Sequence, residues 1–77
     1  MKQAFDKVLD TSGLLCPEPV MLLHKGIRGM ANGETIKVIA TDSSTERDIP
    51  KFCHFLGHTL LKQGKANRIY YYYIRKS

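Results

Sequence analysis

Pro17 and Pro19 restrict where the first helix of this chain can begin. Proline is tolerated in a first helical turn, whose amides have no intrahelical partner, and is costly further in. Apolar residues then recur at helical spacing, at Val20, Leu23, Ile27 and Met30. The pattern predicts a helix that starts at about Pro17, with Cys16 at or beside its N-cap.

The segments on either side of this helix have the alternation of β-strands. Residues 4–9 predict a short strand, closed by the turn formers of residues 10–13. Residues 34–40 place Ile36, Val38 and Ala40 on one side, which predicts a strand packed on at least one face. Residues 58–63 and 68–74, joined by residues 64–67, predict a β-hairpin.

The segment between these strands leaves two alternatives. Ser43 and Glu46 have the spacing of a capping box, but Pro50 would interrupt a helix that ran on from there. Either a short turn ends near Asp48, or Asp48 caps a new helix that Gly57 closes. The buried face of that second helix would carry Ile49, Phe52, Phe55 and Leu56.

The predicted order is βαβαββ, which indicates the α/β class. The expected architecture is a two-layer α/β sandwich with two helices on one face of a mixed four-stranded sheet. A chain of 77 residues is expected to form one domain. Such a chain buries only about 60% of the surface that its unfolded form exposes, which argues against a large enzyme with a deep substrate cavity.

Charge is distributed unevenly along the chain. The net charge is +5, yet residues 1–48 carry six Lys and Arg against seven Asp and Glu, and residues 49–77 carry six against none. The basic half favours an acidic partner, either protein or nucleic acid. The longest apolar run, residues 69–74, is far shorter than the roughly 20 residues of a membrane span, so we expect no membrane association and a cytoplasmic location.

Cys16 is the leading candidate for chemistry. A thiol at a helix N-terminus meets free amides and the positive end of the helix dipole, and both favour the thiolate. The amides of Glu18 and Val20 are candidate donors to the sulfur, whereas the Glu18 carboxylate opposes ionisation. The sequence therefore predicts a nucleophilic Cys16 with a modestly lowered pKa, and the alternative is a buried cysteine that happens to precede a helix.

Cys16 begins the motif Cys-Pro-Glu-Pro, and the chain around it resembles a known family. The segments LDTSGLLCPEPVMLLHKGIRGM, NGE, RDIPKFCHFLGHTL and the final strand ending in IRKS are similar, in order and spacing, to the TusA (SirA-like) family of small sulfur carriers. The resemblance covers residues 9–76. The segment DIPKFC resembles the branch of the family that acts in tRNA 2-thiouridine formation.

The resemblance implies a fold of the βαβαββ type and a persulfide on Cys16. It implies that residues 1–77 form a single sulfur-carrier domain that accepts sulfane sulfur from a cysteine desulfurase. The sulfur would then pass to a downstream sulfur-relay protein complex for thiolation of the tRNA wobble uridine. The chain would be a sulfurtransferase-type carrier rather than a stand-alone hydrolase or oxidoreductase, would need no cofactor, and would be a monomer when free.

Other polar and sulfur residues have plainer interpretations. Cys53 could resolve a Cys16 persulfide into a disulfide, but its neighbours Phe52 and Phe55 favour a buried thiol. Cys53, His54 and His58 could supply three zinc ligands if the helix continued past Gly57, but no fourth ligand stands at standard spacing, so we expect no metal site. Asp42 and Asp48 are expected to cap or terminate structure.

The run from Tyr70 to Tyr73 suggests an alternative function. In a strand, Tyr70 and Tyr72 face one way and Tyr71 and Tyr73 the other, so one pair would lie on the open face of the sheet. Aromatic rings beside Lys62, Arg68 and Arg75 would suit a small basic RNA-binding module in which bases stack on the sheet. The run does not match the aromatic signature of the RRM fold, so we expect no direct binding of nucleic acid.

Overall fold

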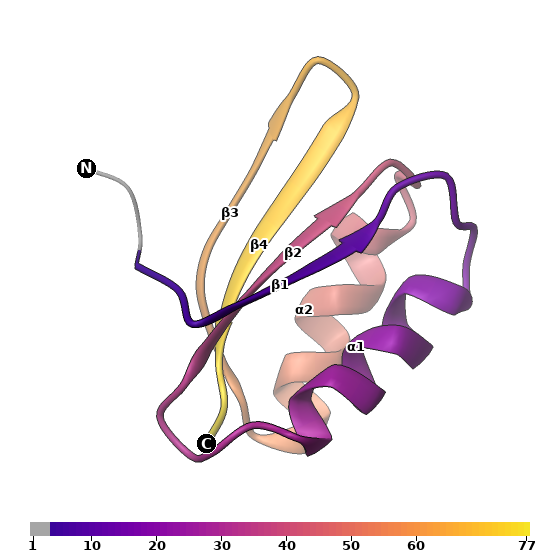
Figure 1. Ribbon diagram of the computed structural model, residues 1–77. Helices are drawn as coiled ribbons and strands as arrows, with labels where there is room; N and C mark the ends of the chain where they lie inside the picture. Colours follow the sequence, from indigo (N-terminus) through magenta and orange to yellow (C-terminus); the bar gives the residue numbers. More distant parts are fainter. Residues whose placement is uncertain (1–3) are drawn as a thin grey trace.

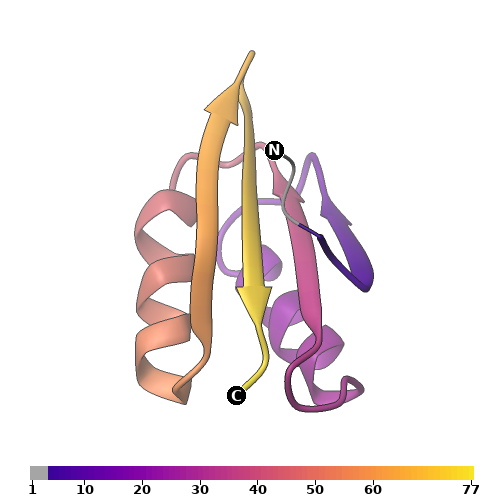
Figure 2. The same cartoon turned by 90° about the vertical axis from the view of Figure 1, so that its left-hand side faces the viewer.

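The computed structural model describes residues 4–77, and this range forms two helices and four strands. The order is β1 (Lys7–Thr11), α1 (Glu18–Arg28), β2 (Thr35–Ala40), α2 (Thr45–Leu56), β3 (Thr59–Ala66) and β4 (Ile69–Arg75). Both helices lie on one face of the sheet, and the other face is open (Figures 1 and 2). The predicted two-layer α/β fold is confirmed. The single-domain prediction for residues 1–77 includes residues 1–3, which lie outside the described range.

The sheet is mixed and has the strand order β1-β2-β4-β3. β1 pairs with β2 in parallel, whereas β4 pairs antiparallel with both β2 and β3. The connection from β1 to β2 runs through α1, and the hairpin of β3 and β4 adds the other half of the sheet (Figure 1). The carboxyl ends of β1 and β2 therefore lie next to each other at one edge of the sheet, directly before the two helices begin.

The core lies between the sheet and the helices. The sheet contributes alternate residues of β2 and β4, which are Ile36, Val38, Ala40, Tyr70, Tyr72 and Ile74. The helices contribute Leu23, Ile27, Ile49, Phe52 and Cys53, at the spacing that keeps one helical face toward the sheet. The predicted inward faces of β2 and α1 are confirmed, with Val20 only partly buried against this cluster.

The predicted first strand covers residues 4–9, whereas β1 begins at Lys7 and extends to Thr11. Parallel pairing with β2 decides this, because Leu9 lies opposite Val38 and Thr11 opposite Ala40. The Thr11 hydroxyl is fully buried and donates a hydrogen bond of 2.7 Å to the Ile39 carbonyl oxygen. A residue type common in turns is thus held in the strand by a tertiary contact.

α2 is one continuous helix with Pro50 inside it. The alternative of a short turn ending near Asp48 is therefore wrong, and the alternative of a helix that Gly57 closes is right about its end but wrong about its start. Proline removes one helical hydrogen bond, but Ile49, Phe52 and Cys53 bury one face of the helix against the sheet and offset that loss. Asp48 lies in the first turn and does not cap a new helix. Gly57 ends the helix with a φ of 75°, as expected.

The C-terminal hairpin has a longer first strand and a shorter turn than predicted. β3 extends to Ala66, and Asn67 and Arg68 form the turn with φ values of 49° and 69°. Positive φ at both central residues is typical of the tight turns whose twist matches a hairpin. β3 includes Gly64, and the Tyr71 ring packs over it where any Cβ would overlap the ring. Among the described residues, no helix is long and apolar enough to cross a bilayer.

Candidate functional site

Cys16 lies in the loop between β1 and α1, one residue before the N-cap Pro17. This loop is tied to the loop between β2 and α2 by two hydrogen bonds. The Gly13 amide donates to the Thr41 hydroxyl at 2.8 Å, and the Cys16 amide donates to Asp42 Oδ2 at 2.6 Å. Both loops follow the carboxyl ends of the parallel strands, so the sheet itself holds the cysteine in place. Cys16 is exposed and forms no disulfide bond.

Asp42 connects Cys16 to the start of α2. Its Oδ1 accepts a hydrogen bond from the Ser44 amide at 3.1 Å, and its Oδ2 accepts one from the Ser44 hydroxyl at 2.8 Å. These bonds from Ser44, followed by the bond from the Cys16 amide, hold the pKa of Asp42 below its usual range. The expectation that Asp42 terminates structure is met in that it caps the turn before α2. Its contact with Cys16 was not foreseen.

The Cys16 thiol faces the Asp48 carboxylate from α2. Sγ donates a hydrogen bond to Asp48 Oδ2 at 3.2 Å, and Arg47 Nε binds the other oxygen, Oδ1, at 2.9 Å. The bond to Asp48 raises the pKa of Cys16 above its ordinary value, and desolvation and the negative charges of Asp48 and Asp42 add to this, while a hydrogen bond with Ser44 opposes it. The expected lowering of the Cys16 pKa is therefore wrong for the free protein.

The helix N-terminus does not act on Cys16 as expected. The Glu18 amide donates to the Leu15 carbonyl oxygen at 2.9 Å and is therefore not available to the sulfur. A helix dipole contributes only about 0.3 to 1 kcal/mol at an exposed terminus, and a carboxylate in direct hydrogen-bond contact outweighs it. Asp48 is the decisive neighbour, and no helix-start argument could reveal it because it is 32 residues away along the chain.

Cys53 occupies a different environment. It is a free thiol on the inner face of α2, 3% exposed, and burial raises its pKa to about 11. His58 lies beyond the end of α2 and packs its ring against Phe52, with ring centroids 6.0 Å apart. Within residues 4–77, no group of three or more His, Cys, Asp and Glu side chains is placed to hold a metal ion.

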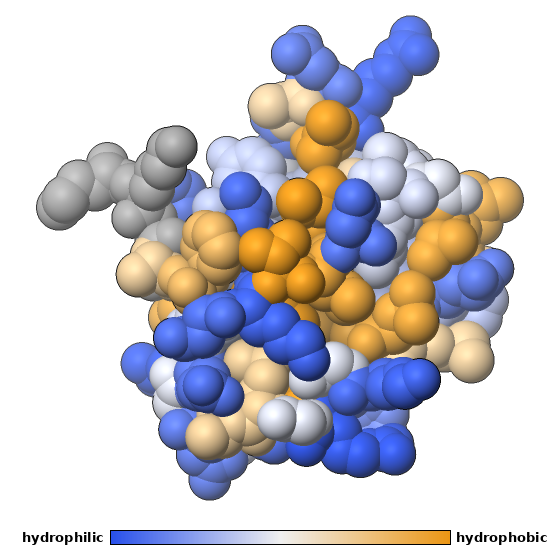
Figure 3. All heavy atoms as spheres, viewed as in Figure 1, coloured by the Kyte–Doolittle hydropathy of each residue, from blue (hydrophilic) through white to orange (hydrophobic). Residues whose placement is uncertain are grey.

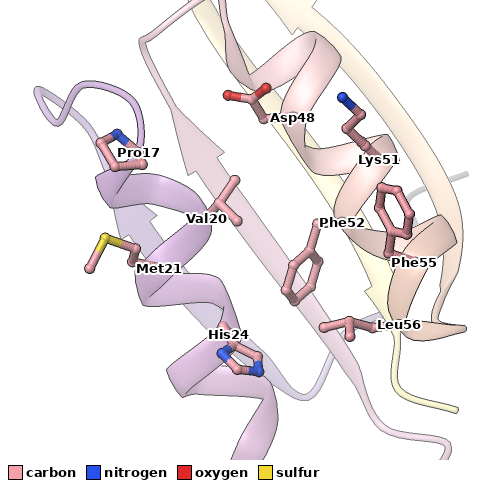
Figure 4. Close-up of a pocket in the computed structure, with 9 residues that line it drawn as sticks. All are labelled: Pro17, Val20, Met21, His24, Asp48, Lys51, Phe52, Phe55 and Leu56. Carbon is pink, nitrogen blue, oxygen red and sulfur yellow. The ribbon is translucent and has the colours of Figure 1, made fainter.

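An apolar groove of about 500 Å³ lies between α1 and α2 (Figure 4). Pro17, the residue after Cys16, and Asp48, which accepts the hydrogen bond from Cys16, both line it. Its lining consists of Pro17, Val20, Met21, His24, Asp48, Lys51, Phe52, Phe55 and Leu56. Met21 is 62% exposed, Phe55 75% and Leu56 48%. The prediction that Phe55 and Leu56 are buried is therefore wrong. Phe55 and Leu56 lie at the end of α2, after Phe52 and Cys53, which are the last residues of the helix in the core. Exposed large apolar side chains at a concave site are typical of contact surfaces.

The tyrosines alternate as predicted, with Tyr70 and Tyr72 in the core. On the open face, Tyr73 is only 6% exposed, because Phe5 packs against its ring at 6.0 Å and Lys37 Nζ lies 5.6 Å from its centre. Figure 3, viewed from the same side as Figure 1, shows a band of apolar side chains at the surface with hydrophilic side chains above and below it. A base could stack on Tyr73 only if these neighbours moved.

The sequence reasoning missed Asp42 and Asp48 as neighbours of the thiol. One signal could have found Asp42: strands that run in parallel bring their following residues together, and Asp42 comes two residues after the end of β2. Asp48 gave no such signal, because its position depends on α2 continuing through Pro50.

Fold and site together define a class: a small two-layer α/β protein that presents one exposed thiol beside an apolar groove. The chain belongs to the family described as Sulfurtransferase TusA, which matches residues 7–76. The family predicted from the Cys-Pro-Glu-Pro motif is thus confirmed.

Known relatives agree with this assignment. The chain is 61% identical over 71 residues to the sulfur carrier protein TusA of Pseudomonas putida (strain W619), covering 92% of this chain and 89% of that one. It is 57% identical over 76 residues to the sulfur carrier protein TusA of Pseudomonas aeruginosa (strain LESB58), covering 99% and 96%. A SirA-like protein from Desulfitobacterium hafniense has the same fold, with a TM-score of 0.81 at 19% identity over 91% of this chain and 96% of that chain.

Proposed function

We propose that the protein is a sulfur carrier and that Cys16 holds the sulfur as a persulfide. The observation that carries this proposal is the exposed Cys16 thiol at the end of an apolar groove, in a chain closely similar to proteins named as sulfur carriers. Cys53 is buried and has a pKa of about 11, so it is a poor candidate for the same role.

The proposed reaction is a thiol exchange in which no net oxidation occurs. The Cys16 thiolate attacks the outer sulfur of a persulfide on the donor, the donor's S–S bond breaks, and the donor cysteine leaves as a thiolate. Cys16 then carries the extra sulfur as S–SH. In the second transfer, an acceptor thiolate attacks that outer sulfur, and Cys16 returns to the thiol form after taking up a proton.

The donor in this proposal is a cysteine desulfurase, and the acceptor is a downstream sulfur-relay protein on the route to the 2-thiolated wobble uridine of tRNA. The groove supports a carrier that works through partners, because Met21 and Phe55 offer exposed apolar contact area in the same groove that Pro17 and Asp48 line. A site open on this side needs no deep cavity of its own, since the partner completes it.

The test of the carrier role is an intact mass measurement after incubation with a cysteine desulfurase and cysteine. The wild-type chain should gain the mass of one sulfur atom, and peptide mass spectrometry should place it on Cys16. Cys53→Ser should still gain the sulfur and Cys16→Ser should not. Sulfur uptake by Cys16→Ser, or its loss in Cys53→Ser with an unchanged circular dichroism spectrum, would refute the one-cysteine mechanism.

The basic half of the chain is proposed to guide an acidic surface of the partner. Lys51 lies at the groove, and Lys62 and Lys65 lie on β3 with exposed side chains. Charges at the edge of an interface act mainly on the rate of encounter. Replacing all three by Glu should slow association with the desulfurase at low salt and flatten its salt dependence. An unchanged association rate would show that the partner uses another surface.

A further inference from the structure

The surroundings of Cys16 are unusual for a nucleophilic thiol. Reactive cysteines generally lie in electropositive places, beside Lys, Arg or a metal. In this otherwise basic protein, the groups facing Cys16 are the carboxylates of Asp48 and Asp42 and the hydroxyl of Ser44. Two cations already act on Asp48: Arg47 is bound to its far oxygen, and the charge of Lys51 acts on it from the next turn of α2. The free protein therefore holds its thiol against a negative charge.

Asp48 is placed to act as a switch on this thiol. Its side chain is 21% exposed, and Arg47, itself 71% exposed, leaves Oδ2 free to accept the hydrogen bond from Sγ. Asp48 also lines the groove next to Cys16. A partner seated in the groove with its cysteine at Cys16 must therefore meet the Asp48 carboxylate at the same time (Figure 4).

We propose that Asp48 keeps Cys16 as a thiol in the free protein and that a partner releases the thiolate by placing a cationic side chain against Asp48. The release transfers one proton from Sγ to water and involves no change of oxidation state. That this partner is a sulfur-relay protein rests on the proposed function. The partner that fits is one with a Lys or Arg beside its sulfur-bearing cysteine, within a surface that is otherwise acidic enough to meet the basic half of this chain.

The arrangement has a chemical advantage for a carrier. The thiolate, not the thiol, reacts with oxidants, alkylating agents and unrelated disulfides. A thiol held protonated by Asp48 is protected while the protein carries no sulfur and has not yet met its donor. A cation at Asp48 removes the electrostatic penalty on the thiolate only in the complex, where exchange is required.

The first experiment measures alkylation of Cys16 by iodoacetamide as a function of pH, with peptide mass spectrometry as the readout. Asp48→Asn should lower the apparent pKa of Cys16 and make alkylation at pH 7 roughly three- to tenfold faster, since each unit of pKa is about a tenfold change in thiolate. Glu46→Gln is the matched control, because it removes the same charge from an exposed residue of the same helical turn. It should leave the profile unchanged.

Arg47→Ala is the second variant, and it should act in the opposite direction. Without the Nε contact, the full charge of Asp48 acts on the thiol, so the Cys16 pKa should rise and alkylation at pH 7 should slow. The inference is overturned if Asp48→Asn reacts no faster than Glu46→Gln, or if Arg47→Ala reacts faster than the wild type.

The second experiment tests the cation with small disulfides of different charge. Cys16 exchanges with cystamine, which is cationic, with bis(2-hydroxyethyl) disulfide, which is neutral, and with dithiodiglycolate, which is anionic. In each case Cys16–SH and RSSR give Cys16–S–SR and RSH. The ratio of the cystamine rate to the dithiodiglycolate rate, each relative to the neutral reagent, should be roughly three- to tenfold higher in the wild type than in Asp48→Asn. Equal ratios in the two proteins would overturn the cation requirement.

Neither experiment uses a sulfur donor. Sulfur uptake is measured separately by intact mass. A protein that takes up no sulfur but shows the Asp48-dependent profile would refute the carrier role and leave the thiol switch standing, and the reverse result would do the opposite.

Discussion

A buried pair of hydroxyls links the sheet to the loop that positions Cys16, and its removal should have a predictable cost. Thr45 and Tyr72 are each 1% exposed, and their hydroxyl oxygens lie 2.8 Å apart. The Thr45 hydroxyl also donates to the Asp42 carbonyl oxygen at 2.7 Å. Because Thr45 has a single hydroxyl proton, Tyr72 must be the donor in their shared bond. The chain of contacts runs from β4 through α2 to the residue that holds the Cys16 amide.

The magnitudes follow from which groups each substitution leaves unpaired. Tyr72→Phe removes one donor and leaves Thr45 still bound to the Asp42 carbonyl, so it should cost about 0.5 to 1.5 kcal/mol. Thr45→Val removes both bonds and leaves the Tyr72 hydroxyl buried without a partner, so it should cost about 2 to 4 kcal/mol. The double variant should cost less than the sum of the two, because the phenylalanine ring that replaces Tyr72 carries no hydroxyl to be left unpaired.

The assay is equilibrium unfolding in urea, followed by circular dichroism at pH 7. With a slope of about 1 kcal/mol per molar urea for a small domain, Tyr72→Phe should lower the midpoint by about 1 M and Thr45→Val by about 2 to 4 M. Thr45→Ser is the control: it loses the methyl group but keeps the hydroxyl, so it should keep both hydrogen bonds and cost less than Thr45→Val. Equal costs for the two single variants, or strict additivity in the double variant, would refute the assigned direction of the bond.

Three further outcomes are expected. Gly64→Ala should lower the free energy of unfolding by about 1 to 3 kcal/mol, because a methyl group there overlaps the tyrosine ring that packs over the glycine, and a change under about 0.5 kcal/mol would contradict this. In the native protein, iodoacetamide should modify the exposed Cys16 faster than the buried Cys53 at every pH, and peptide mass spectrometry that showed the reverse order would contradict the burial argument. The Asp42 carboxylate, whose pKa Ser44 lowers, contributes stability above its unfolded pKa of about 3.9, and this is lost as pH falls through the lower folded value. The acid limb of a stability–pH curve should therefore be shallower in Asp42→Asn.

The sequence alone determined the features that depend on local pattern. Helical spacing after Pro17 and Pro19 located α1, and alternation in residues 34–40 located β2 and its inward face. Cys16 could be predicted as the candidate nucleophile because its motif lies at the junction of a loop and a helix. These patterns are short in range, so they are visible without knowledge of what packs where.

The tertiary structure alone decided the features that depend on distant contacts. Pro50 remains within a helix because the face carrying Ile49 and Phe52 is buried against the sheet. The ionisation of Cys16 depends on Asp48, which α2 brings to 3.2 Å from the sulfur across 32 residues of chain. Local propensity is worth only tenths of a kcal/mol per residue, whereas burial of one large apolar side chain is worth about 1.5 to 3 kcal/mol, and a direct hydrogen bond to a carboxylate outweighs a helix dipole. Packing therefore set the helix, and the helix set the chemistry of the thiol.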